Sequence, residues 1–281
     1  MKQKSLTRKE LFKEWRFLFE CEAGCHTSIS GKQRFLEFLK IAHKIPPPKS
    51  ILDMGGNKGT ERWLQHAFPE AKITILNNSE KQIASCSRII KGDAQDFSTD
   101  EKYDLIFAGE IIEHLYNPDG LIASCLLALR PGGHLVLTTP NLACFYNRIF
   151  LLLGWSPAAY FPSLRYHVGN PLLPKTDGRF GIIADHKSVF TWKGLEALLR
   201  YYGVEILATR GYTYAQDEAS RIVGDRFYRL PMVQWRFFLN AFFPKSLREG
   251  MLFVCRRPEG LDDARLAEGK LRQKIWEIDG Q

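Results

Sequence analysis

The sequence predicts an α/β fold built on a doubly wound, mostly parallel sheet. Short apolar segments alternate with amphipathic segments between residues 51 and 141. The first apolar segment runs directly into a glycine-rich turn at 55–59, and a later one, at 103–108, is followed by two carboxylates and an imidazole. Strands that alternate with helices form βαβ units, whose helices cover both faces of a parallel sheet. The alternation therefore indicates an α/β domain with polar groups gathered where strands end.

The expected strands of this core are runs of apolar residues, and they lie at 51–54, 71–76, 88–91, 103–108 and 134–139. The expected helices between them lie at 60–67, 80–86 and 120–129. Arg130-Pro-Gly-Gly133 closes the last helix, because proline cannot continue a helix. The alternation is interrupted after residue 141. It resumes with an amphipathic helix at 191–202 and closing strands at 204–209 and 251–256.

The ends of the chain and the interruptions define the predicted domain organisation. Residues 8–43 have helical apolar spacing and predict two helices, broken near residues 24–31 and ended by Ile45-Pro-Pro-Pro48. We therefore expect a helical N-terminal cap at 1–48. The α/β domain follows at 49–257, with inserts at about 142–189 and 212–250, and a peripheral tail completes the chain at 258–281. Long inserts in a compact domain usually form lids or binding walls.

The composition is that of an ordinary globular protein, with 45% hydrophobic and 25% charged residues. No apolar run follows the basic start, so a secretory signal is not expected. The six cysteines have no paired spacing, which favours free thiols in a reducing compartment. We therefore expect a cytoplasmic protein, or one held peripherally at the inner membrane face. The net charge of +8 is concentrated outside 51–141, which favours an anionic partner.

The turn that follows the first strand has the features of a cofactor site. Gly55, Gly56 and Gly59 allow backbone to approach a ligand more closely than a side chain would permit. Asp53 precedes the first glycine by two residues, so the spacing is Asp-x-Gly-Gly-x-x-Gly. An aspartate there suits a ligand with a positive group, which a pyrophosphate lacks. The turn therefore favours S-adenosylmethionine over a nicotinamide dinucleotide.

A second candidate site follows the strand at 103–108. Glu110, Glu113 and His114 are three and four residues apart, and on a helical turn such residues share a face. His186 precedes a later helix and is expected to return over the same sheet edge. Together the four side chains suit Mg²⁺, Mn²⁺, Fe²⁺ or Zn²⁺, and such an ion could activate a hydroxyl acceptor. In the alternative without a metal, His114 is the general base, assisted by Glu113 and His186.

These segments together resemble the class I S-adenosylmethionine-dependent methyltransferases. The resemblance is carried by six pieces: Ile51-Leu-Asp-Met-Gly-Gly-Asn-Lys-Gly59, Gly92-Asp-Ala94, Tyr103-Asp-Leu-Ile-Phe107, Glu110-Ile-Ile-Glu-His114, Leu129-Arg-Pro-Gly-Gly133 and Thr138-Thr-Pro-Asn141. It implies a Rossmann-like, seven-stranded sheet whose last strand is antiparallel. It also implies that residues 55–59 line the methionine part of the donor and that Glu110 lies beside it. Asp93 would accept from the adenine amino group, with the Ala94 amide facing the ring.

The sequence departs from that family at two positions. Asn77, followed by Asn78, stands where the family usually has an acidic residue that holds the ribose hydroxyls. Asn57 replaces the middle glycine of the turn. An amide oxygen still accepts from a hydroxyl, but without the charge that strengthens such a bond. The resemblance therefore implies weaker donor binding. A sheet that has lost its cofactor and serves as a scaffold stays an alternative.

The Glu-x-x-Glu-His element with a later histidine resembles two metal-dependent methyltransferase groups. One comprises the ubiquinone-biosynthesis O-methyltransferases, which act on catechol-type polyprenyl phenols. The other comprises the small-RNA terminal 2′-O-methyltransferases. Relatives without a known metal share Glu-x-x-Glu-His, and in them the histidine packs or hydrogen-bonds. The metal and metal-free alternatives therefore both stay open.

Two segments, 147–157 and 226–243, mix aromatic residues with arginine. Such a surface suits a lipid-linked or glycan acceptor at an anionic membrane, and it also suits stacked bases with phosphates. The sequence has no basic low-complexity arm, which disfavours nucleic acid. We therefore expect a methyltransferase that acts on a hydroxyl of a small or lipid-linked, anionic molecule such as a sugar or phenol. An RNA ribose 2′-O-methyltransferase is the alternative enzyme, and nothing in the sequence indicates an oligomeric state.

Overall fold

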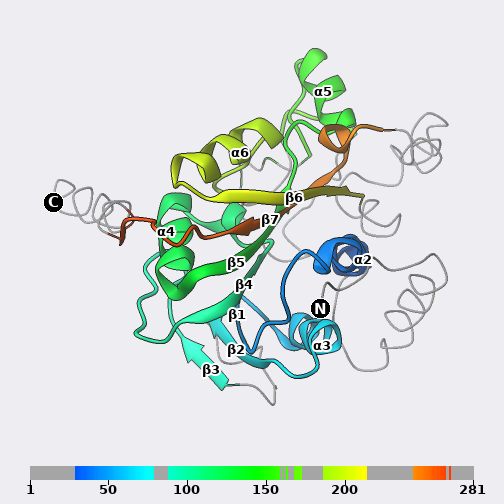
Figure 1. Cartoon of the computed structure of the whole chain (residues 1–281). Helices are drawn as coiled ribbons and strands as arrows, with labels where there is room; N and C mark the ends of the chain where they lie inside the picture. Colours follow the sequence, from blue (N-terminus) through cyan, green and yellow to red (C-terminus); the bar gives the residue numbers. More distant parts are fainter. Residues whose placement is uncertain are drawn as a thin grey trace, which may run out of the picture.

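The computed structural model describes residues 29–78, 88–158, 160, 163, 168–172, 186–213, 243–263 and 266. Its centre is a seven-stranded sheet with the order β3-β2-β1-β4-β5-β7-β6 (Figure 1). The strands are β1 (Ser50–Met54), β2 (Lys72–Asn77), β3 (Arg88–Lys91), β4 (Tyr103–Gly109), β5 (Leu129–Pro140), β6 (Glu205–Tyr212) and β7 (Gly250–Arg256).

The direction of the strands matches the predicted fold. The pairs β1–β2, β1–β4, β2–β3 and β4–β5 are parallel. The last strand, β7, is antiparallel to both neighbours, β5 and β6. The chain winds outward in one direction from β1 through β2 to β3, and then in the other direction from β4. In a doubly wound sheet, ligands bind outside the carboxyl ends of the strands at this reversal, here between β1 and β4.

Helices cover both faces of the sheet. They are α2 (Ile29–Ala42), α3 (Lys58–Ala67), α4 (Pro118–Ala128), α5 (Phe145–Leu152) and α6 (Trp192–Tyr201), with short 3₁₀ turns η2 (Ile112–His114) and η3 (Lys245–Leu247). In Figure 1, α2 and α3 lie on one side of the sheet and α4 and α6 on the other. Two separate clusters of buried apolar side chains correspond to these two layers.

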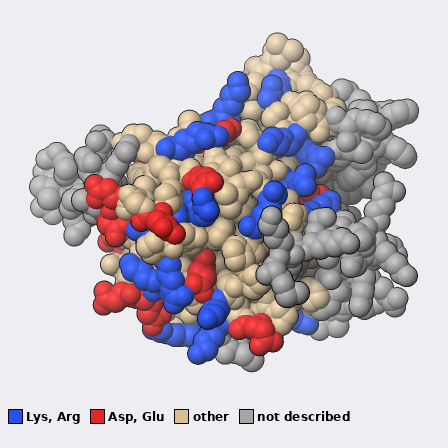
Figure 2. All heavy atoms as spheres, viewed as in Figure 1, with Lys and Arg blue, Asp and Glu red and all other residues tan. Residues whose placement is uncertain are grey.

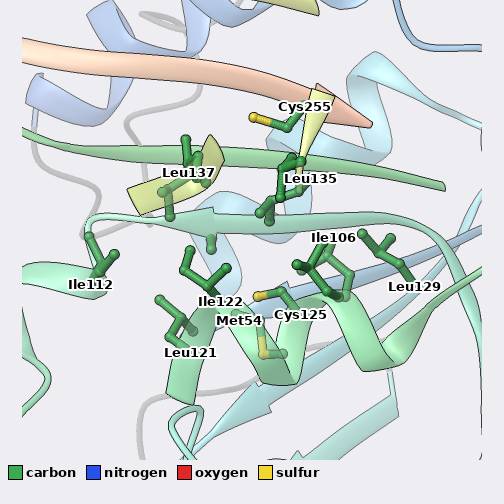
Figure 3. Close-up of a cluster of buried hydrophobic side chains, with 14 of the residues drawn as sticks. Met54, Ile106, Ile112, Leu121, Ile122, Cys125, Leu129, Leu135, Leu137 and Cys255 are labelled. Atoms are coloured by element: carbon green, nitrogen blue, oxygen red, sulfur yellow. The ribbon is translucent and has the colours of Figure 1, made fainter. Parts of the chain in front are cut away.

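The cluster under α4 packs this helix against the centre of the sheet. Leu121, Ile122 and Cys125 of α4 lie against Ile106 of β4 and Leu135 of β5 (Figure 3). The helix can be buried around most of its circumference because its residues are mostly apolar, and almost every one of them is buried. This packing fixes β4 and β5, the strands whose carboxyl ends carry the candidate site.

The cysteines of the described residues are free thiols, in line with the prediction. They are Cys125, Cys144 and Cys255, and all three are buried. Burial raises the pKa of the Cys255 thiol to about 12, so this group stays neutral and serves as a small apolar side chain. Cys21, Cys25 and Cys86 lie outside the described residues.

The cluster on the other face joins α2 to the sheet through aromatic side chains. The ring centroid of Phe35 lies 5.3 Å from that of Trp63 on α3. Phe38 contacts Phe68 and Phe107, with centroid distances of 6.2 and 5.8 Å. Edge-on ring contacts of this kind stabilise a core beyond the burial of area alone. Helix α2 therefore packs directly on the α/β core.

Helix α4 ends before Arg130-Pro-Gly-Gly133, as the sequence predicted, but these four residues form an irregular first part of β5, so the strand begins earlier than the expected residue 134. Tyr103 pairs with Leu129, and Leu105 pairs with His134, so the extra residues of β5 bulge out of the ladder. Gly132 has a φ of 75° there, and its amide donates to the Arg257 carbonyl at 3.0 Å. The backbone of the bulge is therefore hydrogen-bonded to Arg257, which follows β7, and the local sequence does not reveal this long-range contact.

Several other predictions concern residues outside the described part of the chain, namely the first N-terminal helix, the helix at 80–86, part of the first insert, most of the second insert and most of the tail. The predicted break near residues 24–31 is too long, because α2 already begins at Ile29. The domain boundaries stay a prediction. Among the described residues, none of the helices has the length and apolar character needed to cross a bilayer.

We expect Phe38→Ala to lower the free energy of unfolding by about 3–5 kcal/mol, because it opens a cavity among aromatic rings. The control is Leu152→Ala, which removes a side chain that is 86% exposed and should change stability by about 0.5 kcal/mol or less. Urea unfolding followed by circular dichroism measures both. Equal losses in the two variants would contradict the central position of α2.

Candidate active site

The glycine-rich turn after β1 is built so that side chains cannot replace its first two glycines. Gly55 has a φ of 74°, and a Cβ on it would lie 2.6 Å from Cδ1 of Ile111. A Cβ on Gly56 would lie 2.0 Å from Oδ2 of Asp53. The Gly55 amide donates to the Leu76 carbonyl at 2.7 Å, which ties the turn to the end of β2. The backbone is thus held close to the neighbouring strand ends.

Asn57 begins α3 rather than extending the glycine turn. Its φ is −144°, an extended conformation that does not require glycine, and its side-chain oxygen accepts from the Gly59 and Thr60 amides at 2.8 and 3.2 Å. The Thr60 hydroxyl in turn accepts from the Asn57 amide, which completes a capping box. This capping role accounts for the asparagine at a position where the resemblance implies glycine.

Asp53 lies beneath the turn and is almost fully buried. The Thr60 hydroxyl donates to its carboxylate. Burial raises the pKa of Asp53 to about 7, and the hydrogen bond from Thr60 and the positive charge of Arg34 only partly offset this effect. Asp53 is therefore a carboxylate that a nearby positive charge would stabilise in its ionised form.

The remaining residues predicted to bind the donor lie along the same edge. Asn77, at the end of β2, donates from its side-chain amide to the Gly56 carbonyl at 2.9 Å, and exposed Asn78 follows it. The Gly92 amide donates to the Asn77 carbonyl at 3.2 Å, which brings the loop after β3 alongside. In that loop Asp93 is exposed and accepts from the Gln95 amide at 2.9 Å, and Ala94 is buried.

Glu110, the first residue after β4, is held by two side chains that the sequence analysis did not identify. Tyr212, at the end of β6, donates its hydroxyl to the Glu110 carboxylate at 2.5 Å. Arg34 of α2 lies 3.5 Å from the same carboxylate oxygen. Burial, together with the negative charge of Glu110, raises the pKa of Tyr212 well above its ordinary value, so its hydroxyl keeps its proton and remains a donor.

A signal for Arg34 was present in the sequence. It directly precedes Phe35 and Leu36 on the apolar face of α2, where a charged residue is unexpected unless it is paired. Tyr212 gave no such signal, because a tyrosine at the end of a strand is ordinary in a core. Only the return of β6 to the sheet edge places it beside Glu110.

Glu113, His114 and His186 form a second cluster beyond η2. One ligand atom from each lies within 4.8 Å of the others. Nε2 of His114 is 3.9 Å from Oε1 of Glu113, and the rings of His114 and His186 are edge-on, with centroids 4.9 Å apart. The Glu113 side chain is buried, whereas 40% of the His114 side chain is exposed. The cluster thus runs from the core to an accessible surface.

Glu113 is anchored on its buried side. Its carboxylate accepts from the Thr139 hydroxyl at 2.9 Å. Burial raises the pKa of Glu113 well above its ordinary range, and the negative charge of Glu110 raises it further. A cation beside this carboxylate would reverse that effect.

The segment that carries His186 is fixed to the cluster by backbone contacts. The Glu113 carbonyl accepts from the Lys187 amide at 2.6 Å and from the Ser188 amide at 3.1 Å. The Ser188 hydroxyl donates to the Leu115 carbonyl at 2.8 Å. These bonds confirm that the segment returns over the edge, as the sequence predicted.

The expected convergence of all four side chains is wrong for Glu110. This residue has a φ of 53°, and η2 begins only at Ile112, so Glu110 is not on one helical face with Glu113 and His114. Its carboxylate points to Tyr212 and Arg34 instead. Two imidazoles and one carboxylate remain, and this donor set still suits Fe²⁺, Zn²⁺ or Mn²⁺.

The sequence matches the family described as "Methyltransferase domain" over residues 31–209. A trans-aconitate 2-methyltransferase of Acidovorax sp. (strain JS42) is 31% identical over 109 residues, which span 36% of this chain and 42% of that protein. A malonyl-[acyl-carrier protein] O-methyltransferase of Methylococcus capsulatus is 33% identical over 110 residues, 35% of this chain and 40% of that protein. The matches thus span about two fifths of these curated relatives.

The fold is similar to that of a solved structure, Haemonchus contortus phosphoethanolamine N-methyltransferase 2 in complex with S-adenosyl-L-methionine. The TM-score is 0.53 at 15% identity, and the likeness covers 90% of this chain and 57% of that chain. The match to the methyltransferase domain covers more than half of the sequence and includes both the glycine turn and the Glu113–His114–His186 cluster. The chain therefore belongs to the class I S-adenosylmethionine-dependent methyltransferases.

Proposed function

We propose that this protein transfers a methyl group from S-adenosylmethionine to an oxygen of a small or lipid-linked, acidic acceptor. The observation that carries the proposal is the position of two sites on one edge of the sheet. The turn at Gly55 and Gly56 follows β1, and the Glu113–His114–His186 cluster follows β4, the strand paired with β1. A donor in the turn and an acceptor at the cluster would therefore be neighbours.

The curated relatives support an acidic acceptor. One is named for trans-aconitate and another for O-methylation of malonyl-[acyl-carrier protein]. A hydroxyl of a sugar or phenol, as the sequence analysis expects, would use the same oxygen chemistry. The donor supplies a methyl group on a positively charged sulfur, which leaves as a neutral thioether when the acceptor oxygen takes the methyl group.

For a hydroxyl acceptor the protein must also accept a proton. His114 is exposed enough to contact an acceptor, and Glu113 lies behind it at 3.9 Å. An imidazole that takes the hydroxyl proton becomes positively charged, and the Glu113 carboxylate would stabilise that charge. His186, packed edge-on against His114, limits the rotation of the ring. Positioning and proton removal are the main contributions such a reaction needs.

The same cluster fits a divalent metal, with Glu113, His114 and His186 as ligands. A bound ion would lower the pKa of an acceptor hydroxyl and orient it. The buried carboxylate with a raised pKa supports this assignment, because an adjacent cation would stabilise its ionised form. The metal-free reaction through His114 uses the same residues, so a measurement of metal binding distinguishes the metal-assisted reaction from the metal-free one.

The direct test is calorimetric titration of the full chain with S-adenosylmethionine and with its demethylated product. We expect both to bind, and we expect Gly56→Ala to weaken binding at least about tenfold, because its Cβ would displace Asp53. The control is Gly260→Ala, since a Cβ there meets no atom within 4 Å. An absence of binding at millimolar donor would favour the scaffold alternative. Trans-aconitate and malonyl thioesters are the first acceptors to assay with labelled donor.

We expect donor affinity to rise with pH between about pH 5 and pH 7 and then to level off. In the free chain Asp53 has a pKa of about 7, so it holds a proton below this pH. A positively charged donor favours the ionised form, and its binding must release that proton. Titrations in buffers of different ionisation enthalpy measure the release. Asp53→Asn should bind weakly and without this pH dependence. An unchanged pH profile in Asp53→Asn would contradict the assignment.

For the metal we expect Co²⁺ to bind the chelator-treated chain and to give the visible absorption of a site with nitrogen ligands. His114→Ala and His186→Ala should each weaken binding at least about 100-fold, because each removes a ligand. His66→Ala changes a histidine on α3, outside the cluster, and should leave the spectrum unchanged. Glu110→Gln should also retain the spectrum. If Co²⁺ does not bind, or if it binds equally to all variants, the metal assignment fails.

A further inference from the structure

The end of α5 exposes three consecutive leucines. Leu151, Leu152 and Leu153 are 54%, 86% and 53% exposed, and Tyr160 nearby is 45% exposed. We call residues 151–153 the leucine tip. In Figure 1, α5 extends beyond α6 at the top of the molecule. Contiguous exposed apolar groups of this kind mark interaction sites.

The leucine tip is held by an ordered base. Phe150 and Tyr146, on the same helix, are buried. After the helix the chain turns back, because the Gly154 amide donates to the Leu151 carbonyl at 3.0 Å and the Trp155 amide donates to the Phe150 carbonyl at 2.7 Å. The leucines are therefore displayed by a fixed turn, not by a frayed helix end.

The arrangement of the three leucines favours a lipid bilayer over a protein partner as the surroundings of the tip. Successive residues of a helix point about 100° apart, so three in a row cover more than one side of the helix end. A protein partner buries one face of a helix, in an i, i+3, i+4 pattern. A bilayer surrounds an inserted tip on all sides. Half-buried Trp155 and exposed Tyr160 follow the tip in the chain, and aromatic residues of this kind are enriched at membrane interfaces.

The charges near the leucine tip are those that an anionic surface attracts. No aspartate or glutamate occurs between Asp119 and Asp177, a stretch that contains the whole of α5. Exposed Arg148 lies on α5 itself, one turn before the tip. Figure 2 shows an uncharged top with Lys and Arg side chains gathered below it. Basic residues beside an inserted apolar group strengthen binding to anionic lipids.

We propose that the leucine tip inserts into an anionic membrane and that Arg148 and neighbouring basic residues contact the lipid headgroups. Helix α5 follows the carboxyl end of β5, so the helix that carries the tip begins at the same edge of the sheet as the candidate active site. The membrane contact rests on the proposed function and specifies its acceptor, which is a lipid-linked molecule that enters the site from the membrane surface.

The test is co-sedimentation of the full chain with vesicles of phosphatidylcholine alone and of phosphatidylcholine mixed equally with phosphatidylglycerol. We expect binding to the mixed vesicles, several-fold weaker binding to phosphatidylcholine alone, and a loss with added salt. The triple variant Leu151→Gln, Leu152→Gln, Leu153→Gln should partition at least about 100-fold less, because it removes the inserted apolar groups. Tyr201→Gln replaces another exposed apolar side chain, on α6, and should bind as the unaltered chain does.

Three outcomes would overturn the proposal. The first is no binding of the unaltered chain to either vesicle, and the second is equal binding of the triple variant. The third is self-association in sedimentation velocity that the triple variant loses while vesicles have no effect, which would make the tip a contact between copies. Donor titration of the triple variant keeps the two proposals separate. Vesicle binding without donor binding would remove the proposed function alone, and donor binding without vesicle binding would remove only the membrane contact.

Discussion

The conformation of Glu110 determines how the carboxyl edge of the sheet is assembled. A left-handed backbone at a residue other than glycine costs on the order of 1–2 kcal/mol, so contacts elsewhere must hold it. Its amide donates to the Thr138 carbonyl at 3.0 Å, and its carboxylate is held by Tyr212 and Arg34. Because the chain leaves β4 in this direction, η2 turns Glu113 inward to Thr139 and leaves His114 outward. One residue thus connects α2, β4 and β6.

The electrostatics of this edge favour a cationic ligand. Asp53 and Glu113 are buried carboxylic acids whose pKa values are raised by burial. Within the described part of the chain, Arg34 is the cation that lowers both pKa values, and it also lies against Glu110. Among the described residues, the single positive charge of Arg34 does not balance the negative charges that Asp53, Glu110 and Glu113 carry when ionised. A sulfonium donor near Asp53 and an imidazolium or metal near Glu113 would each supply charge where it is needed, which links the buried acids to methyl transfer.

Local patterns were sufficient to predict most of the fold. The strands, α3, α4 and α6 follow from apolar periodicity, and the turn follows from glycines whose Cβ positions are occupied by Asp53 and Ile111. Contacts between distant segments could not be predicted in the same way. Tyr212 meets Glu110 across 102 residues of sequence, and the bulge in β5 depends on backbone bonds to Arg257. The helical face assumed for Glu110 failed because its backbone conformation is set by those distant partners.

The leucine tip and the Glu113–His114–His186 cluster are held by the same part of the chain, the end of β5. The Leu142 amide, just before α5, donates to the Phe190 carbonyl at 2.9 Å, and Phe190 belongs to the segment that carries His186. Asn141 is buried, and its side chain donates to the Ser246 and Arg248 carbonyls at 2.8 and 2.9 Å. The end of β5 therefore fixes both the base of α5 and the return of His186. A membrane that holds the tip would consequently hold the acceptor side of the sheet at a defined orientation to the lipid surface.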